Sequence, residues 1–226
     1  MTKKSLAIIT GASRGIGRAL ALALADEVCA PSSDHEHHQN IHMVLIARSA
    51  EALQETANMI ESDKEGSRAV ITTSCHALDL SDIENLPIKF QDIIESLSSD
   101  ATQYDKCLLI NNAGSVGPLG RCESVSSSSM KELSTALNLN ITSSIWLSSQ
   151  FTKIFANKEH HNEVRIVNIS SICAIEPFPT MSIYCAGKSA RDMYHSVLAK
   201  ENYSAADEKD SKGGKEKFKV LNYAPG

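Results

Sequence analysis

Six short runs of β-branched and aliphatic residues recur along this chain, and longer segments with helical spacing separate them. The runs are LAIIT (6–10), HMVLIA (42–47), AVITTSC (69–75), CLLIN (107–111), VRIVNIS (164–170) and FKVLNY (218–223). Strands that alternate with helices are joined by crossovers, which place the strands parallel in one sheet. Nearly continuous apolar strands are typical of a sheet covered on both faces. The pattern therefore predicts an α/β fold, with a doubly wound, mostly parallel sheet and helices on both faces.

The segments between the runs predict five helices by their apolar periodicity and by Ser or Asp near their starts. We expect these helices at residues 14–29, 49–62, 82–98, 129–156 and 181–203. The serine run 126–129 is expected to cap the fourth helix. Two polar stretches, 31–40 and 203–217, are predicted to be exposed excursions. The histidines in the first stretch lack convergent ligands, so no metal site is expected at His35, His37 and His38.

Composition narrows the class of protein. A chain of 226 residues with 42% hydrophobic residues predicts a single domain over residues 1–226. A formal net charge of -5 argues against a nucleic-acid partner, because phosphate backbones need a basic face. No apolar run is as long as a signal peptide or approaches the roughly 18 residues of a membrane span. The six cysteines form no C-x-x-C pair. We therefore expect a cytoplasmic protein with reduced thiols, no zinc site and no membrane partner.

The first predicted strand runs directly into TGASRGIG, residues 10–17, and then into an apolar helix. Glycines in such a turn let the backbone approach a pyrophosphate, whose charge is stabilised by the free N–H groups of the helix start. The spacing here is G-x-x-x-G-x-G instead of the commoner G-x-G-x-x-G. The turn therefore predicts a dinucleotide site that contains Gly11, Ala12, Ser13, Arg14, Gly15, Ile16 and Gly17.

The end of the second predicted strand indicates which dinucleotide is bound. An NAD site usually has an acid there to hold the ribose 2′-hydroxyl, whereas an arginine accommodates a 2′-phosphate. This chain has Ala47 and Arg48 at that point, and Arg14 adds a second cation. We therefore predict NADP(H) as the cofactor. Asp79 and Leu80, at the expected end of the third strand, are either an adenine contact or the N-cap of the next helix.

Five motifs in order resemble the short-chain dehydrogenase/reductase family over most of the chain. They are TGASRGIG, NNAG at 111–114, Asn140 in the fourth helix, NISS at 168–171 and YCAGK at 184–188. The pieces LLINNAGS, VNISSICAIEPF, YCAGKSARDM and VLNYAPG are most similar to those family members that reduce side-chain carbonyls of pterins with NADPH. The resemblance implies a Rossmann fold, an NADPH-dependent carbonyl reductase, and a homodimer formed through the helices that begin at Ser129 and Met181.

Tyr184 and Lys188 lie four residues apart and so share one face of a helix. A free tyrosine has a pKa near 10, too high for ready proton exchange at neutral pH. An ammonium about 4 Å away, at an effective dielectric constant of about 20, favours the phenolate by roughly 4 kcal/mol, or about three pKa units. We therefore predict that Tyr184 is the acid that protonates a carbonyl oxygen. By the resemblance, Lys188 also binds the nicotinamide ribose.

Ser171 lies thirteen residues before Tyr184, just past the fifth predicted strand. Ligands collect at the carboxyl ends of parallel strands, so Ser171 and Tyr184 are expected to converge on one substrate oxygen, with Ser170 as a structural residue. The other expected substrate contacts are Ile172 and Gly226.

Two further roles follow from the resemblance. Asn140 would hold a water that relays protons to Lys188, and Asn138 is the competing candidate for this role. The turn of Asn112, Ala113 and Gly114 follows the fourth predicted strand and is expected to pass under the adenine ribose, or simply to make a tight turn.

The printed sequence ends at NYAPG. By the resemblance, this Pro-Gly opens a substrate loop that precedes a helix and a seventh strand, so we expect the domain to end after its sixth strand and the substrate half to be incomplete. Three functions remain open: a pterin carbonyl reductase, a general ketone or diketone reductase, and a non-catalytic NADP-binding protein. Four intact residues favour an enzyme, because a retired site has no physical need for all of them: Ser171, Tyr184, Lys188 and Asn140.

Overall fold

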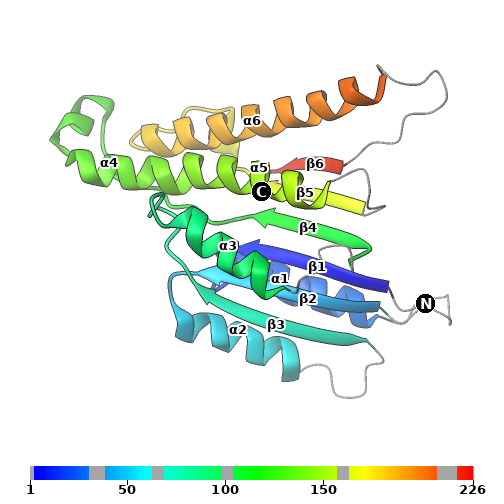
Figure 1. Cartoon of the computed structure of the whole chain (residues 1–226). Coiled ribbons are helices and arrows are strands. Elements are labelled where there is room, and N and C mark those ends of the chain that lie inside the picture. Colours follow the sequence, from blue (N-terminus) through cyan, green and yellow to red (C-terminus); the bar gives the residue numbers. More distant parts are fainter. Residues whose placement is uncertain are drawn as a thin grey trace.

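A computed structural model describes residues 3–30, 39–62, 69–97, 104–156, 163–207 and 218–225. Within these ranges, six strands form one sheet in the order β3-β2-β1-β4-β5-β6, and every neighbouring pair is parallel (Figure 1). The predicted doubly wound α/β fold is confirmed. The strands are β1 (Lys3–Thr10), β2 (Gln39–Ala47), β3 (Val70–Ala77), β4 (Lys106–Asn111), β5 (Glu163–Ile169) and β6 (Phe218–Tyr223).

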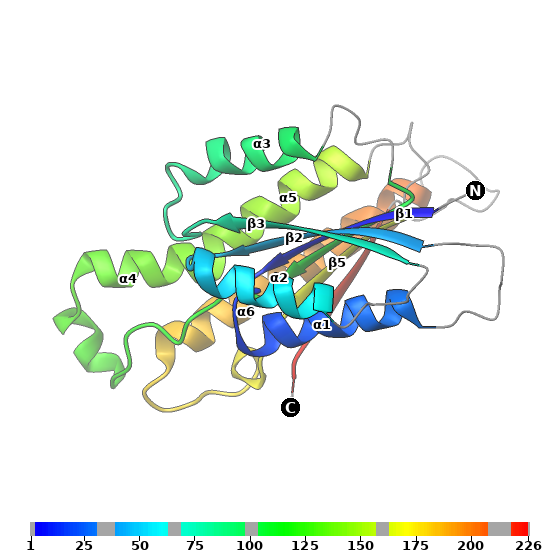
Figure 2. The same cartoon turned by 90° about the horizontal axis from the view of Figure 1, so that it is seen from below.

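Helices cover both faces of this sheet, as the sequence predicts. Figure 2 shows α1 and α2 below the sheet and α3 and α5 above it. The helices are α1 (Gly15–Cys29), α2 (Ala50–Ser62), α3 (Leu86–Ser96), α4 (Met130–Leu137), α5 (Ser143–Phe155) and α6 (Ser182–Asp207). Two apolar layers hold them: alanines of α1 pack with Leu53 and Ile60 of α2 on one face, and Phe90 of α3 packs with Phe151 of α5 on the other.

The helix predicted at 129–156 is instead two helices joined by a π-helical turn, η3 (Asn138–Thr142). The predicted cap is confirmed, because Ser129 Oγ accepts from the N–H of Glu132 and the Glu132 carboxylate accepts from the Ser129 N–H. The wider turn lies where the side chain of Asn140 is bonded to the backbone of a neighbouring loop, at Ser115. Helical periodicity alone carries no sign of such a contact.

Other boundaries also differ from the prediction. Strand β2 begins at Gln39, so the end of the predicted excursion 31–40 is strand, and α6 continues to Asp207, into the predicted excursion 203–217. Helix α3 begins at Leu86 instead of residue 82, because the Asp82 carboxylate accepts from the Asn85 side chain in a preceding turn. His35, His37, His38 and Gly226 lie outside the described residues.

No helix in the described parts of the chain is long and apolar enough to span a bilayer. The six cysteines all lie in the described ranges and are free thiols. Among the same residues, no three His, Cys, Asp or Glu side chains gather as metal ligands would.

Candidate active site

The glycine turn between β1 and α1 depends on glycine for two different reasons. Gly11 and Gly15 have positive φ angles of 69° and 56°, which most residues avoid. Gly17 has no room for a side chain, because a Cβ there would lie 2.1 Å from the carbonyl oxygen of Gly11. A Cβ at Gly15, by contrast, would meet no atom within 4 Å. The turn is therefore tightly packed on its inner side and open at Gly15.

A side-chain clamp that the sequence analysis missed holds the outer side of this turn. Arg18 Nη2 donates to the carbonyl oxygen of Ser13 at 2.6 Å, and Arg18 Nε donates to Thr56 Oγ1 at 2.9 Å. Thr56 Oγ1 in turn lies 3.1 Å from the carbonyl oxygen of Ala12, to which it donates. An ion pair between Arg18 and Glu55 at 3.0 Å completes the link to α2. The clamp fixes the carbonyl groups of Ala12 and Ser13. Arg18 and Thr56 are 38 residues apart in the sequence, so no sequence pattern predicts their contact.

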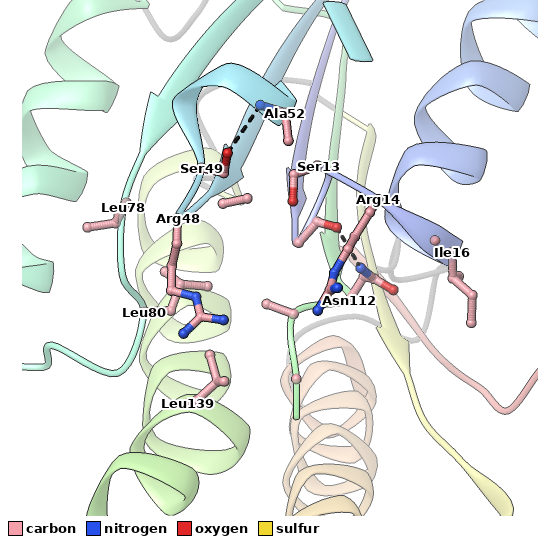
Figure 3. Close-up of a pocket in the computed structure, with 15 residues that line it drawn as sticks. Ser13, Arg14, Ile16, Arg48, Ser49, Ala52, Leu78, Leu80, Asn112 and Leu139 are labelled. Atoms are coloured by element: carbon pink, nitrogen blue, oxygen red, sulfur yellow. Dashed lines mark hydrogen bonds between the residues drawn. The ribbon is translucent and has the colours of Figure 1, made fainter. Parts of the chain in front are cut away.

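A cavity of about 650 Å³ opens beside the glycine turn. Figure 3 shows Arg14 and Arg48 on opposite sides of it. Neither guanidinium has a hydrogen bond or ion pair with any residue the structure describes. A glycine cradle with two available cations fits a dinucleotide that carries phosphates. The lining residues are Gly11, Ser13, Arg14, Gly15, Ile16, Ala47, Arg48, Ser49, Ala52, Leu78, Leu80, Asn112, Ala113, Gly114 and Leu139.

This lining contains most of the cofactor residues predicted from the sequence, and it adds Ser49, Ala52, Leu78 and Leu139. Ala12 and Gly17 are buried in the turn instead. Asp79 does not line the cavity either, and the N-cap interpretation of Asp79 is wrong, because α3 begins seven positions later.

The Asp79 carboxylate instead accepts from the N–H and the hydroxyl of Ser81, at 2.9 and 2.7 Å. Burial works against the ionised form, but these two bonds and the charge of Arg48 outweigh it and lower the pKa of Asp79. A contact of Asp79 with adenine stays a prediction.

The turn of residues 112–114 joins the cavity to the core of the sheet. Thr10 Oγ1 accepts from the N–H groups of Asn112 and Ala113, at 3.0 Å each. The Asn112 side chain donates to the carbonyl oxygens of Thr10 and Gly11, at 3.0 and 3.3 Å. Because these bonds link β4 to the glycine turn, the two motifs form one rigid edge of the cavity.

Asn140 is buried, and both ends of its side-chain amide are engaged. Its Nδ2 donates to the carbonyl oxygen of Ser115 at 2.8 Å, and its Oδ1 accepts from the N–H of Ser115 at 3.0 Å. The amide thus holds the loop that follows the 112–114 turn. The expected water relay through Asn140 stays a prediction, as does the alternative at Asn138, which lies in the same π-helical turn.

Ser171, Tyr184 and Lys188 meet at the carboxyl end of β5. The Ser171 hydroxyl accepts from the N–H of Cys173 and lies near enough to the side chain of Tyr184 to favour its ionised form. Lys188 Nζ lies 5.5 Å from the centre of the Tyr184 ring and donates to the carbonyl oxygen of Ile169 at 2.6 Å. Ser170 points elsewhere, since its hydroxyl donates to Asp192 at 2.5 Å.

Proton affinities in this group differ from the expectation. Burial raises the pKa of Tyr184, although the neighbouring Ser171 hydroxyl and the charge of Arg191 act in the other direction. Burial, followed by the charge of Arg191, lowers the pKa of Lys188 to about 7. The expected lowering of the Tyr184 pKa is therefore wrong for the chain without ligands, because the loss of water around the phenol dominates.

The family model described as short chain dehydrogenase matches residues 5–205. The chain belongs to the short-chain dehydrogenase/reductase family. It is similar to a sepiapterin reductase of Xenopus tropicalis, with 35% identity over 98% of this chain and 73% of that protein. A benzil reductase of Bacillus subtilis is 33% identical over 84% of this chain and 64% of that protein. The chain is thus an NAD(P)-dependent oxidoreductase that acts on CH–OH and carbonyl groups.

Solved structures agree on the fold. A metagenomic short-chain oxidoreductase in complex with NADP has a TM-score of 0.72 and 23% identity, over 98% of this chain and 82% of that chain. An alcohol dehydrogenase from Thermococcus sibiricus, complexed with 5-hydroxy-NADP, has a TM-score of 0.68 and 21% identity, over 99% of this chain and 76% of that chain.

Proposed function

We propose that this chain is an NADPH-dependent carbonyl reductase of the sepiapterin reductase type, which reduces the side-chain carbonyl of a pterin. One observation carries the proposal: Ser171, Tyr184 and Lys188 lie together at the carboxyl end of β5, and the dinucleotide cavity lies at the carboxyl ends of β1, β2 and β4 in the same sheet. Similarity to sepiapterin reductases, at 31–35% identity over 98–99% of the chain, supports the substrate class.

The choice of NADPH over NADH rests on Arg14 and Arg48. Both side chains are exposed at the cavity and form no ion pair with a carboxylate within the described residues. A guanidinium binds a phosphate with charge-assisted hydrogen bonds, and no acid at the end of β2 competes for a ribose hydroxyl. The cavity therefore suits the extra phosphate of NADP.

The bound cofactor would supply a hydride from nicotinamide C4 to the carbonyl carbon. Ser171 Oγ would donate a hydrogen bond to the carbonyl oxygen and so stabilise the negative charge that develops there. Tyr184 Oη would give its proton to that oxygen, which completes the alcohol. Lys188 would then return a proton toward Tyr184, since its pKa of about 7 lets it exchange protons near neutrality.

A diketone of the benzil class is a second candidate substrate. Exposed apolar side chains follow Ser171 directly, at Ile172, Ile175 and Phe178. Such a surface suits an aromatic diketone, and the Bacillus subtilis relative carries the name of a benzil reductase.

A homodimer through the predicted helix that begins at Ser129, which is α4 and α5 in the structure, and through α6 also belongs to this proposal. Met193 and Val197 lie one turn apart on α6 and are 66% and 45% exposed, which leaves an apolar stripe for a second copy to cover.

The decisive experiment compares the wild-type chain with Tyr184→Phe. NADPH oxidation is followed with sepiapterin and with benzil, and NADPH binding is measured by fluorescence titration. We expect Tyr184→Phe to lose about 10²-fold or more in turnover and to keep its affinity for NADPH, because only the proton donor is removed. Tyr194→Phe, in the same helix but outside the site, is the matched control. If Tyr184→Phe turned over as fast as Tyr194→Phe, the proton-transfer role would be wrong; NADPH binding by the wild type without turnover of either substrate would favour a non-catalytic protein.

A further inference from the structure

Helix α6 carries a stripe of charged and polar side chains toward the protein interior instead of toward solvent. Lys188, Arg191 and His195 are 3%, 0% and 0% exposed, and they recur at three- and four-residue spacing on one face. Burial of a cation is expensive unless every donor is satisfied. Arg191 is the largest of the fully buried side chains, so its contacts should show which part of the structure its burial stabilises.

All three contacts of the Arg191 guanidinium are to neutral oxygens from two strand ends. Nη2 donates to the carbonyl oxygen of Asn111 at 2.6 Å, Nη1 to that of Ala113 at 2.9 Å, and Nε to Asn168 Oδ1 at 2.9 Å. The Asp192 carboxylate, next in sequence, is occupied by Asn168 and Ser170. The guanidinium therefore ties the ends of β4 and β5 to α6 without an ion pair of its own.

The position of Arg191 links the dinucleotide cavity to the group of Ser171, Tyr184 and Lys188. The carbonyl groups of Asn111 and Ala113 flank Asn112, and both Asn112 and Ala113 line the dinucleotide cavity. Arg191 itself lies one helical turn beyond Lys188, on the helix that carries Tyr184. Gly114 fits closely between Asn140 and Arg191, because a Cβ at Gly114 would lie 3.0 Å from Asn140 Oδ1 and 3.8 Å from Arg191 Nη1.

We propose that Arg191 is a positioning residue of the reductase: its buried guanidinium fixes the 112–114 turn relative to Tyr184 and Lys188 on α6. The proposal rests on the proposed function for its effect on turnover. The effect of the Arg191 charge on Lys188 exists in the chain without cofactor, so a failure of this proposal can be distinguished from a failure of the proposed function.

Arg191 also acts on Lys188 through its charge, in addition to the larger effect of burial. Arg191 favours the neutral amine, whereas Asp192 on α6 and Cys173 on the turn after β5 favour the ammonium. The other groups that meet Lys188 are the ring of Tyr184 and the carbonyl oxygen of Ile169. Arg191 is thus the one cation among the interactions that set this pKa in the described chain, so its loss raises the pKa of Lys188.

Two substitutions separate the geometry from the charge. Arg191→Gln removes the charge and the fork of donors, and Arg191→Lys keeps the charge but cannot bond all three oxygens. The control is His195→Gln, one turn further along the same buried stripe. His195 donates from Nδ1 to the carbonyl oxygen of Arg191 and accepts at Nε2 from Ser148, without contact to the 112–114 turn.

The first readout is the titration of Lys188 in the cofactor-free chain, followed by NMR on ¹³C-labelled lysine and assigned with Lys188→Met. We expect the wild type, Arg191→Lys and His195→Gln to titrate near neutrality, and Arg191→Gln to titrate at higher pH. An unchanged titration in Arg191→Gln would overturn the role of the charge, and this holds even if the wild type reduces no substrate tested.

The second readout is turnover at saturating NADPH, on variants whose folding is checked by thermal unfolding. Both Arg191 variants should lose about 10²-fold in kcat, since a displacement near 1 Å has that effect. Their affinity for NADPH should change by less than about threefold, or about 0.7 kcal/mol, because Thr10 still holds the 112–114 turn. A folded Arg191→Lys with wild-type kcat, or one no slower than His195→Gln, would refute the positioning role, and this variant still decides the question if Arg191→Gln does not fold.

Discussion

Replacement of Arg48 by alanine should change the choice of cofactor more than the binding of cofactors in general. The Arg48 guanidinium is exposed at the cavity, opposite Arg14, and no described carboxylate forms an ion pair with it. A charge-assisted hydrogen bond to a phosphate contributes about 1.5–3 kcal/mol. Because solvent screens an exposed charge, we expect the lower end of this range, which corresponds to a loss of about 10- to 30-fold in NADPH affinity.

The measurement is a fluorescence titration of the cofactor-free protein with NADPH and with NADH. For Arg48→Ala, the dissociation constant should rise for NADPH and stay nearly unchanged for NADH, because NADH has no 2′-phosphate. Added salt should weaken NADPH binding in the wild type more than in the variant. The same direction, with a similar size, is expected for Arg14→Ala.

Arg18→Gln is the matched control, since Arg18 is a third arginine at the same turn. Its guanidinium is bonded to Ser13, Thr56 and Glu55, so it supports the turn and is not available to the 2′-phosphate. Its loss should weaken NADPH and NADH by the same factor. Equal losses of both cofactors in Arg48→Ala would refute the assignment of Arg48, and a selective loss of NADPH in Arg18→Gln would refute the distinction between the arginines.

Three further outcomes are expected. Gly17→Ala should lower the free energy of unfolding by about 3 kcal/mol or more, because the added Cβ would overlap the Gly11 carbonyl oxygen. Ile16→Ala, in the same turn but at an exposed side chain, should have little effect, and thermal unfolding compares the two variants. Lys188 has a pKa of about 7 when folded and 10.5 as its ordinary value, so it destabilises the folded chain fully below pH 7 and progressively less up to pH 10.5. Lys188→Met should therefore raise the unfolding temperature more at pH 6 than at pH 9, and an equal effect at both would contradict the neutral amine. Light scattering at micromolar concentration should show a dimer, and Met193→Glu should shift it toward the monomer; a monomeric wild type would contradict the proposed interface.

The sequence predicts the architecture well because its signals are local. The apolar runs predict all six strands, and Ser129 predicts a helix start through a capping contact only three residues long. Helix periodicity also places Tyr184 and Lys188 on one face, and the structure brings Ser171 to them.

What the sequence does not predict depends on contacts between distant segments. Charged residues on a helix usually indicate a solvated face, so nothing marks Lys188 and Arg191 as interior residues. The π-helical turn at Asn140 depends on a loop 25 residues away, and the clamp of Arg18 on Thr56 crosses 38 residues. Proton affinities depend on burial, which a sequence does not state, and this is why the pKa of Tyr184 is raised where the pairwise argument expects it to be lowered.

The central place of β1 in the sheet has a consequence for the order in which this protein assembles. Strand β1 pairs with β2, and on its other side with β4, whose residues come about a hundred positions later, as in the pairing of Ser5 with Lys106. The Thr10 hydroxyl likewise accepts hydrogen bonds from the N–H groups of Asn112 and Ala113, which are synthesised about a hundred residues later. On the ribosome, the first strand and its glycine turn therefore emerge long before their partners. Non-local pairing of this kind slows folding. The lining of the cofactor pocket extends to Leu139, so the pocket can form only after more than half of the chain has been synthesised.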